Sequence, residues 1–166
     1  MPDAAPQRRL EITWEDPQQV AAAARTLSGL EFLQAMIAGR IPPPPVANLL
    51  NMRLAEVHKG RAVFEIDLGE QHYNPIGVVH GGIAATLLDS AMGCAVQTTL
   101  EAGVAYTTLE IKVNMVRAVT LAAGTLSAVA SVIHVGSRTA TAEGRFVDAA
   151  GKLYAHATTT CIILRP

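Results

Sequence analysis

The sequence has few charged residues and very few aromatic ones. Charged side chains make up 16% of the 166 residues and aromatic side chains 4%, whereas half of the chain is hydrophobic. Such a composition predicts a core of Ala, Val, Leu and Ile, with apolar surface left over that we expect an oligomer to bury. The 13 basic and 14 acidic side chains give a net charge of −1 without a basic cluster, which argues against nucleic acid as a partner.

Cysteines and long apolar runs are also scarce. Cys94 and Cys161 have neither the spacing of metal ligands nor that of a disulfide framework. The N-terminus lacks the basic and apolar segments of a secretory signal, and no stretch of about 18 residues is free of polar interruptions. We therefore expect a cytoplasmic protein with reduced core thiols, no metal and no membrane contact.

The length is sufficient for one domain with a substantial core. We predict a flexible polar arm over residues 1–17, a helix with a proline-rich connector over residues 18–45, and the main domain over residues 46–166. The arm contains no periodic apolar pattern, which is the reason for separating it from the helix.

One amphipathic helix is expected in the N-terminal extension, over residues 18–38. Its apolar residues recur at helical spacing, with Gly29 as a single interruption. Asp16-Pro17 is a suitable helix start, since proline is favoured at the first helical position. Residues 46–50, after the proline run, are too few to classify.

The main domain combines strand patterns with one long apolar helix. Residues 83–96 carry apolar side chains at helical spacing with almost no polar face, which indicates a helix buried on most sides. The strand patterns cover residues 52–57, 62–68, 105–116, 124–134, 138–148 and 153–164. This order predicts an α+β domain in which an antiparallel sheet wraps around a central helix.

The candidate site lies at the start of that helix. The turn residues before it place the helix start near His80, where the first amide N–H groups lack partners within the helix and stabilise an oxyanion. Asp89 stands inside the apolar run, and burying an uncompensated carboxylate costs several kcal/mol. It is either a functional group or an Asp that bonds a nearby backbone or hydroxyl group.

His80 and Asp89 cannot meet on one helix. Nine helical residues separate them by about 180° and about 13 Å. If both serve one site, the carboxylate comes from a second copy of the helix. We therefore expect a dimer or a dimer of dimers, paired through the longest strand, residues 105–116.

A family resemblance adds to this interpretation. Asn74, His80-Gly81-Gly82 and Asp89-Ser90-Ala91, with their spacing, resemble the signature of the hotdog-fold thioesterases of the phenylacetic-acid-degradation (PaaI-like) type. Thr108-Leu109-Glu110, followed by Val113-Asn114 and Arg117, is similar to the strand after the helix in that family. The resemblance spans roughly residues 45–163 and implies a hotdog fold and an acyl-CoA thioesterase without metal or redox cofactor.

The resemblance also implies catalytic roles. The Gly81 amide would polarise the thioester carbonyl, and His80 would stabilise the leaving thiolate or orient the loop. Asp89 would attack through an activated water or directly, assisted by the Thr108 hydroxyl. Asn74 would hold the attacking water or the carbonyl oxygen, or else simply shape its turn.

Five further residues are predicted near the substrate. Ser90 would support the carboxylate, and Gly82 is explained by close packing between helix and sheet. Gly136-Ser137-Arg138 resembles the turn that faces the coenzyme A phosphates in the family, although an ordinary hairpin with a solvated arginine fits equally well.

Other functions fit less well. A hotdog protein that binds acyl-CoA without hydrolysing it is the main alternative, and a dehydratase acting on hydroxyacyl thioesters fits the motif poorly. The chain lacks the G-x-S-x-G motif of serine hydrolases. Cys94 lies about 21 Å along the helix from His80, which argues against a cysteine nucleophile.

Overall fold

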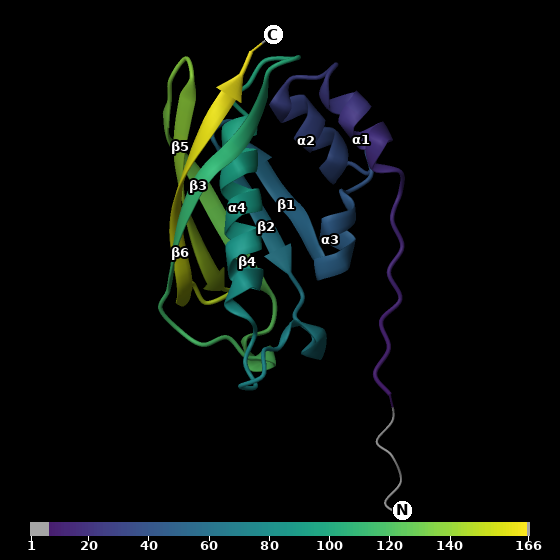
Figure 1. The fold of residues 1–166 in the computed structure, drawn as a ribbon, viewed down its shortest axis with the longest axis vertical. Coiled ribbons are helices and arrows are strands. Elements are labelled where there is room, and N and C mark those ends of the chain that lie inside the picture. The colour runs from purple at the N-terminus through teal and green to yellow at the C-terminus, as the bar shows by residue number, and fades with distance from the viewer. Residues whose placement is uncertain (1–6, 166) are drawn as a thin grey trace, which may run out of the picture.

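The computed structural model describes residues 7–165 as a sheet curved around one long helix (Figure 1). The sheet is antiparallel with strand order β1-β2-β4-β5-β6-β3. The strands are β1 Met52–His58, β2 Arg61–Ile66, β3 Ala105–Met115, β4 Leu126–Val135, β5 Thr139–Asp148 and β6 Leu153–Leu164, and the long helix is α4, Gly81–Gln97. The predicted α+β arrangement is confirmed. One detail is wrong, because β6, with 12 residues, is longer than β3, with 11.

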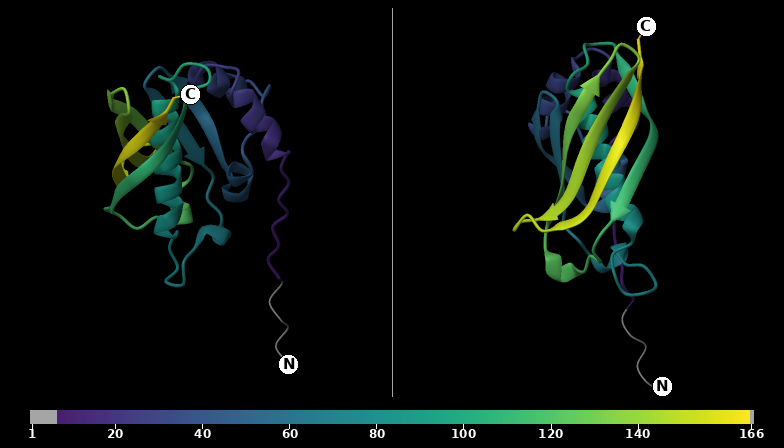
Figure 2. Two further views of the ribbon diagram at one scale, coloured as in Figure 1. Left: turned by 45° about the horizontal axis from the view of Figure 1, so that its top comes forward. Right: turned by 90° about the vertical axis from the view of Figure 1, so that its left-hand side faces the viewer.

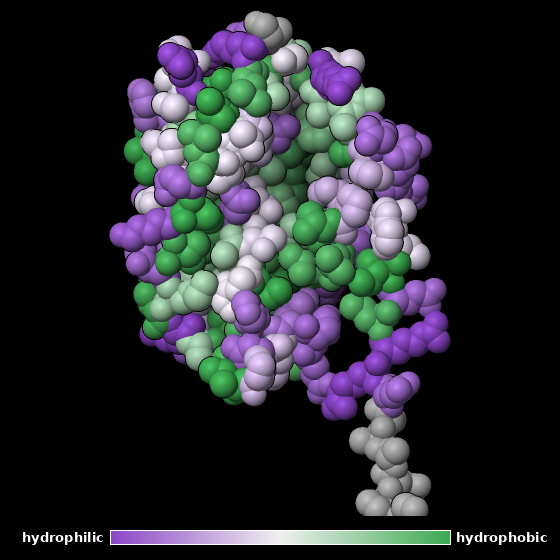
Figure 3. Space-filling model, viewed as in Figure 1, coloured by the Kyte–Doolittle hydropathy of each residue, from purple (hydrophilic) through white to green (hydrophobic). Residues whose placement is uncertain are grey.

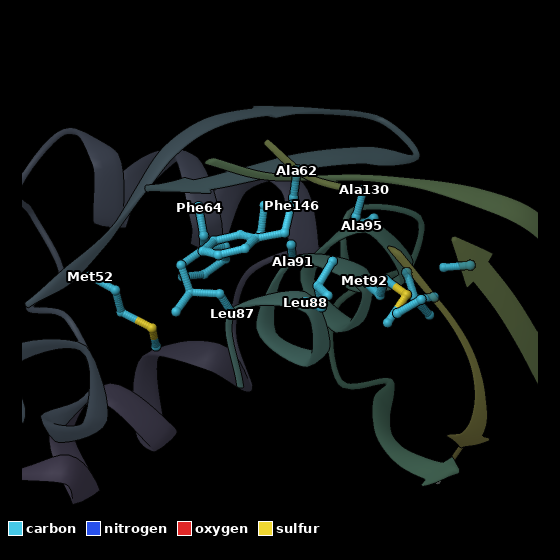
Figure 4. Close-up of a cluster of buried hydrophobic side chains, with 14 of the residues drawn as sticks. Met52, Ala62, Phe64, Leu87, Leu88, Ala91, Met92, Ala95, Ala130 and Phe146 are labelled. Atoms are coloured by element: carbon cyan, nitrogen blue, oxygen red, sulfur yellow. The ribbon is translucent and has the colours of Figure 1, made fainter. Parts of the chain in front are cut away.

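The core lies between α4 and the concave face of the sheet. Leu87, Leu88, Ala91 and Met92 are fully buried and meet apolar side chains from the strands, among them Phe146 (Figure 4). Burying one such leucine or methionine contributes about 1.5–3 kcal/mol. The surface of α4 is apolar on almost all sides because strands curve around the helix on several sides (Figure 2).

Two helices replace the single N-terminal helix that the apolar spacing suggested. They are α1, Pro17–Ala24, and α2, Gly29–Ile37. The prediction missed a capping box, in which Ser28 accepts from the Glu31 N–H and the Glu31 carboxylate accepts from the Ser28 N–H. Reciprocal capping of this kind starts a new helix.

The rest of the extension is held against the domain. The predicted start at Asp16-Pro17 is confirmed, with the Asp16 side chain accepting from the Gln18 N–H at 2.9 Å. The unclassified residues form α3, Pro45–Leu50, which ends at Asn51 in the left-handed region. Residues 7–16 form no helix or strand. The arm over residues 1–17 remains a prediction, and its first six residues lie outside the described part of the chain.

Gly29 provides a test of how the extension attaches. A Cβ at this position would lie 1.8 Å from the backbone oxygen of Gln97, and the Gly29 N–H donates to the Leu100 oxygen at 3.0 Å. The Gln97 backbone cannot move aside as the end of a flexible side chain can. We therefore expect Gly29→Ala to lower the free energy of unfolding by about 3 kcal/mol. Denaturant titration measures the change, and a loss below about 0.5 kcal/mol would show that the contact between α2 and α4 is loose.

The two edges of the sheet differ. β1 is flanked by α2 and α3 and carries a bulge between Leu54 and Glu56, whereas β3 has no neighbouring strand on its outer side in the described chain (Figure 1). Leu109 and Met115 on β3 are 58% and 55% exposed, and hydrophobic residues gather on this side of the molecule (Figure 3). Within residues 7–165, no helix is both long and apolar enough to cross a membrane.

Candidate active site

A cavity of about 330 Å³ opens at the N-terminal end of α4. It lies between the loop that precedes the helix and the ends of strands β3, β5 and β6. Three of the residues predicted from the sequence line it, together with apolar side chains and one arginine. The lining residues are Asn74, Val78, Val79, His80, Gly81, Ala84, Met115, Val116, Arg117, Ala118, Val119, Phe146, Tyr154 and Ala155.

Asn74 shapes the loop that forms this cavity. Its side-chain oxygen accepts from the backbone N–H groups of Ile76 and Val78, at 3.1 and 3.3 Å. Its own N–H donates to the Val78 oxygen at 2.8 Å. The side-chain oxygen is therefore occupied by the turn, as expected for an asparagine in a turn. The amide nitrogen remains the group that Asn74 can offer to a carbonyl oxygen or a water.

His80 caps α4 and leaves one helix amide free. Its Nδ1 accepts from the Gly82 N–H at 2.9 Å, and its backbone oxygen accepts from the Ile83 N–H. An accepting Nδ1 places the proton of a neutral ring on Nε2. The Gly81 N–H makes no hydrogen bond within the described chain and lines the cavity. It is the donor that a polarised carbonyl needs at a helix N-terminus.

The two glycines of the motif are explained by different contacts. A Cβ on Gly81 would lie 2.4 Å from the Met115 sulfur, so the glycine lets β3 approach the helix start. A Cβ on Gly82 would lie 2.9 Å from Nδ1 of His80. The expectation that Gly82 allows close packing of helix against sheet is wrong, because Gly82 instead leaves room for the histidine cap.

Asp89 is partly buried in the middle of α4 and is held by β3. The Thr108 hydroxyl donates to its Oδ1 at 2.9 Å, which is the pairing that the sequence predicted for these residues. Within the described chain, no hydrogen bond links the Ser90 side chain to this carboxylate. With one oxygen held by Thr108, the other is available to take a proton or to attack.

The thiols near Asp89 are poor nucleophiles. Burial raises the pKa of Cys94 to about 12, and the Asp89 charge adds to the shift. Burial also raises the pKa of Cys161, on β6. Only a thiolate is strongly nucleophilic, and a pKa of about 12 leaves Cys94 with almost no thiolate at neutral pH. The carboxylate is the only predicted attacking group that suits a hydrolytic step.

The structure separates the predicted site residues into three places. Asp89 and Thr108 do not line the cavity that Asn74, His80 and Gly81 form. Gly136-Ser137-Arg138, the β4–β5 turn, lies at the far end of the sheet, where Thr139 pairs with Ile162. The cavity lies at the near end, where Val147 pairs with Leu153. One copy of the chain therefore does not bring these groups together.

Sequence reasoning assigned no role to the two cationic side chains beside Tyr154, a residue that lines the cavity. Arg117 lines the cavity, and its guanidinium carbon lies 5.9 Å from the centroid of the Tyr154 ring. The Lys152 ammonium lies 5.6 Å from the same centroid. Arg117 also donates to the Leu153 backbone oxygen. The family resemblance included Arg117, and this was the signal in the sequence that could have pointed to it. Its place beside Tyr154 depends on the pairing of β3 with β6, and its hydrogen bond to Leu153 joins residues 36 apart in the sequence.

Within the part of the chain that the structure describes, no three His, Cys, Asp or Glu side chains are grouped as a metal site. A carboxylate held by a hydroxyl, a free helix amide and a largely apolar cavity lined by one arginine are components of an acyl-transfer site. The fold and these groups together define a hotdog-type hydrolase.

Comparisons with known proteins agree with this class. The model of the thioesterase superfamily matches residues 76–155. A candidate esterase of Saccharolobus solfataricus is 33% identical over 120 residues, which are 72% of this chain and 84% of that protein. The 1,4-dihydroxy-2-naphthoyl-CoA hydrolase of Listeria monocytogenes is 29% identical over 104 residues, 63% of this chain and 83% of that protein.

Solved structures show the same relationship. A candidate thioesterase of Ralstonia eutropha, related to phenylacetic acid degradation, superposes with a TM-score of 0.71 at 29% identity, covering 78% of this chain and 98% of that one. The phenylacetic acid degradation protein PaaI of Thermus thermophilus gives a TM-score of 0.65 at 28% identity, covering 74% and 99%. The chain belongs to the thioesterase superfamily, in its PaaI-like, hotdog-fold branch. It is a thioester hydrolase.

Proposed function

We propose that the protein hydrolyses acyl-CoA thioesters to a carboxylic acid and free coenzyme A, at a site shared by two subunits. One observation carries the proposal. Gly81, whose N–H makes no hydrogen bond within the described chain, lines the cavity and lies on the same helix as a carboxylate that does not line it. Both components of an acyl-transfer site are present, and a second copy of α4 running the other way would bring them together.

The reaction follows from the groups in place. The thioester carbonyl oxygen accepts from the Gly81 N–H, and the charge that develops on it is stabilised by the helix N-terminus. Asp89 of the other subunit takes a proton from a water that attacks the carbonyl carbon, or attacks it directly to give an anhydride that water then opens. The C–S bond breaks, and the Nε2–H of His80 stabilises the leaving thiolate, which becomes the free thiol by taking up the proton that the attacking water releases.

The open edge of β3 supports the shared site. Pairing β3 with β3 of a second copy would satisfy its free backbone groups and cover Leu109 and Met115. The same pairing would place the two α4 helices side by side in opposite directions, which is the arrangement that the site needs. The proposed assembly is a dimer, or two such dimers in a homotetramer.

Substrate contacts and conditions complete the proposal. Arg117, which lines the cavity, and Lys152, which lies over the Tyr154 ring, would provide positive charge for coenzyme A phosphates. The turn Gly136-Ser137-Arg138 would serve the site at the other end of the dimer. A carboxylate and a helix amide supply base and oxyanion stabilisation, so the proposed reaction requires no metal or redox cofactor. We also propose that the enzyme works in the cytoplasm.

A panel of aromatic and medium-chain acyl-CoA thioesters, with detection of released thiol, tests the activity. We expect turnover with at least one member, and mass measurement in the same buffer should give two or four copies. Binding without thiol release across the panel would favour the alternative, an acyl-CoA-binding protein. An active monomer would refute the shared site.

A further inference from the structure

His72 is the buried polar side chain with the least complete hydrogen bonding in the described chain. It closes the short 3₁₀ turn η1, Glu70–His72, and is 3% exposed. Its Nδ1 accepts from the Gly69 N–H at 3.1 Å, but Nε2 is buried and makes no hydrogen bond. Thr98 and Thr159 are similarly buried, yet both have hydrogen-bond partners.

The protonation of His72 agrees with this geometry. Burial lowers the pKa of His72, and the backbone oxygen of Leu50, at the end of α3, opposes the shift only in part. The ring is therefore neutral at neutral pH. Because Nδ1 accepts a hydrogen bond, the proton lies on Nε2, and the nearby Leu50 backbone oxygen does not complete a hydrogen bond of normal geometry with it. A leucine would fill such a place without that cost.

The backbone of His72 anchors the loop that carries the candidate site. Its oxygen accepts from the His80 N–H at 2.8 Å, at the cap of α4. Tyr73 then bridges Val79, and the Asn74 N–H bonds the Val78 oxygen. Residues 72–74 and 78–80 thus form a small antiparallel hairpin, and the ring of His72 fixes its base in the core.

We infer that His72 is a positioning residue for thioester hydrolysis. By accepting from Gly69, its ring holds the turn that sets Asn74 and His80 in register across the hairpin. The inference rests on the proposed function. It explains why an incompletely bonded histidine occupies a core position, since no aliphatic side chain can accept from the Gly69 N–H.

Two substitutions at His72 separate positioning from simple packing. His72→Leu fills the core without the unpartnered N–H but cannot accept from Gly69, so we expect its melting temperature to stay within about 4 °C of wild type. Its kcat should fall by about 10- to 100-fold with KM nearly unchanged, because small misplacements of catalytic groups have effects of this size. His72→Asn keeps an acceptor in the place of Nδ1 but leaves a cavity. It should melt earlier and keep most of its kcat.

Thr98→Val is the matched control. Thr98 is buried at the other end of α4, where it accepts from the Gly60 N–H at 2.7 Å. Its loss should lower the melting temperature and leave kcat intact. Hydrogen exchange at the amides of Gly69, Asn74 and His80 should accelerate in His72→Leu and remain near wild type in His72→Asn and Thr98→Val.

Wild-type kcat in His72→Leu would overturn the inference, and so would a kcat that follows the melting temperature across the three variants. An inactive wild-type enzyme on the whole acyl-CoA panel would instead refute the proposed function. In that case the exchange rates still decide whether His72 holds the loop.

Discussion

Asp89→Asn should lower kcat by about 100-fold or more while the affinity for acyl-CoA changes little, since general-base catalysis contributes on that order. Asparagine keeps the shape of the side chain and still accepts from the Thr108 hydroxyl, which lies 2.9 Å from Oδ1. What it loses is the charge and the basicity. Steady-state kinetics with the best substrate of the acyl-CoA panel measures kcat, and binding is measured with a non-hydrolysable thioether analogue.

Asp67→Asn is the control for removing a carboxylate elsewhere. Hydrogen bonds from Thr125 and Arg53 lower the pKa of Asp67, so its charged form is stabilised by folding. Its loss should lower stability, most visibly above the ordinary carboxyl pKa, and leave kcat near wild type. A near-wild-type kcat in Asp89→Asn would show that Asp89 is a structural residue bonded to Thr108.

Mixing two inactive variants should restore activity if the site is shared. Gly81→Val places side-chain atoms where the Met115 sulfur lies. The Met115 side chain can move away because it is flexible and exposed. The fold should survive while the carbonyl site is filled. A heterodimer with Asp89→Asn contains one site with both intact halves, so an equal mixture should recover about a quarter of wild-type activity.

Subunit exchange has to be demonstrated in the same mixture, by mass measurement of differently tagged copies. A mixture of Asp89→Asn with itself in two tags is the matched control and should stay inactive. If exchange occurs and the mixed variants remain inactive, each site is built within one subunit, and the geometry of the cavity requires a different attacking group.

Local patterns were enough to predict most of the fold. The spacing of apolar residues identified α4, and the cap at His80 and the start at Asp16-Pro17 follow from residue types with well-known preferences. The N-terminal helix was mispredicted because the apolar spacing continues through Ser28, although the Ser28 and Glu31 pair was present in the sequence as a capping signal. α3 was too short for periodicity to indicate it.

The site was predictable where the family motif covers its residues. Asn74, His80 and Gly81 form one cavity wall, and Thr108 reaches Asp89 as expected. The rim formed by Arg117 and Tyr154 depends on strand pairing. The burial of His72 likewise depends on how the loop folds onto α3, a contact that no local pattern encodes.

The unequal edges of the sheet decide how far assembly through strands can grow. A protein with two bare edges can add copies without end, as amyloid-like fibres do. Within residues 7–165, β1 is bulged and flanked by helices, which leaves β3 as the bare edge. Two copies that pair through β3 would cover the β3 edges of both. In the proposed dimer, strand addition would therefore terminate at a closed pair, and the N-terminal helices beside β1 would help to prevent further growth.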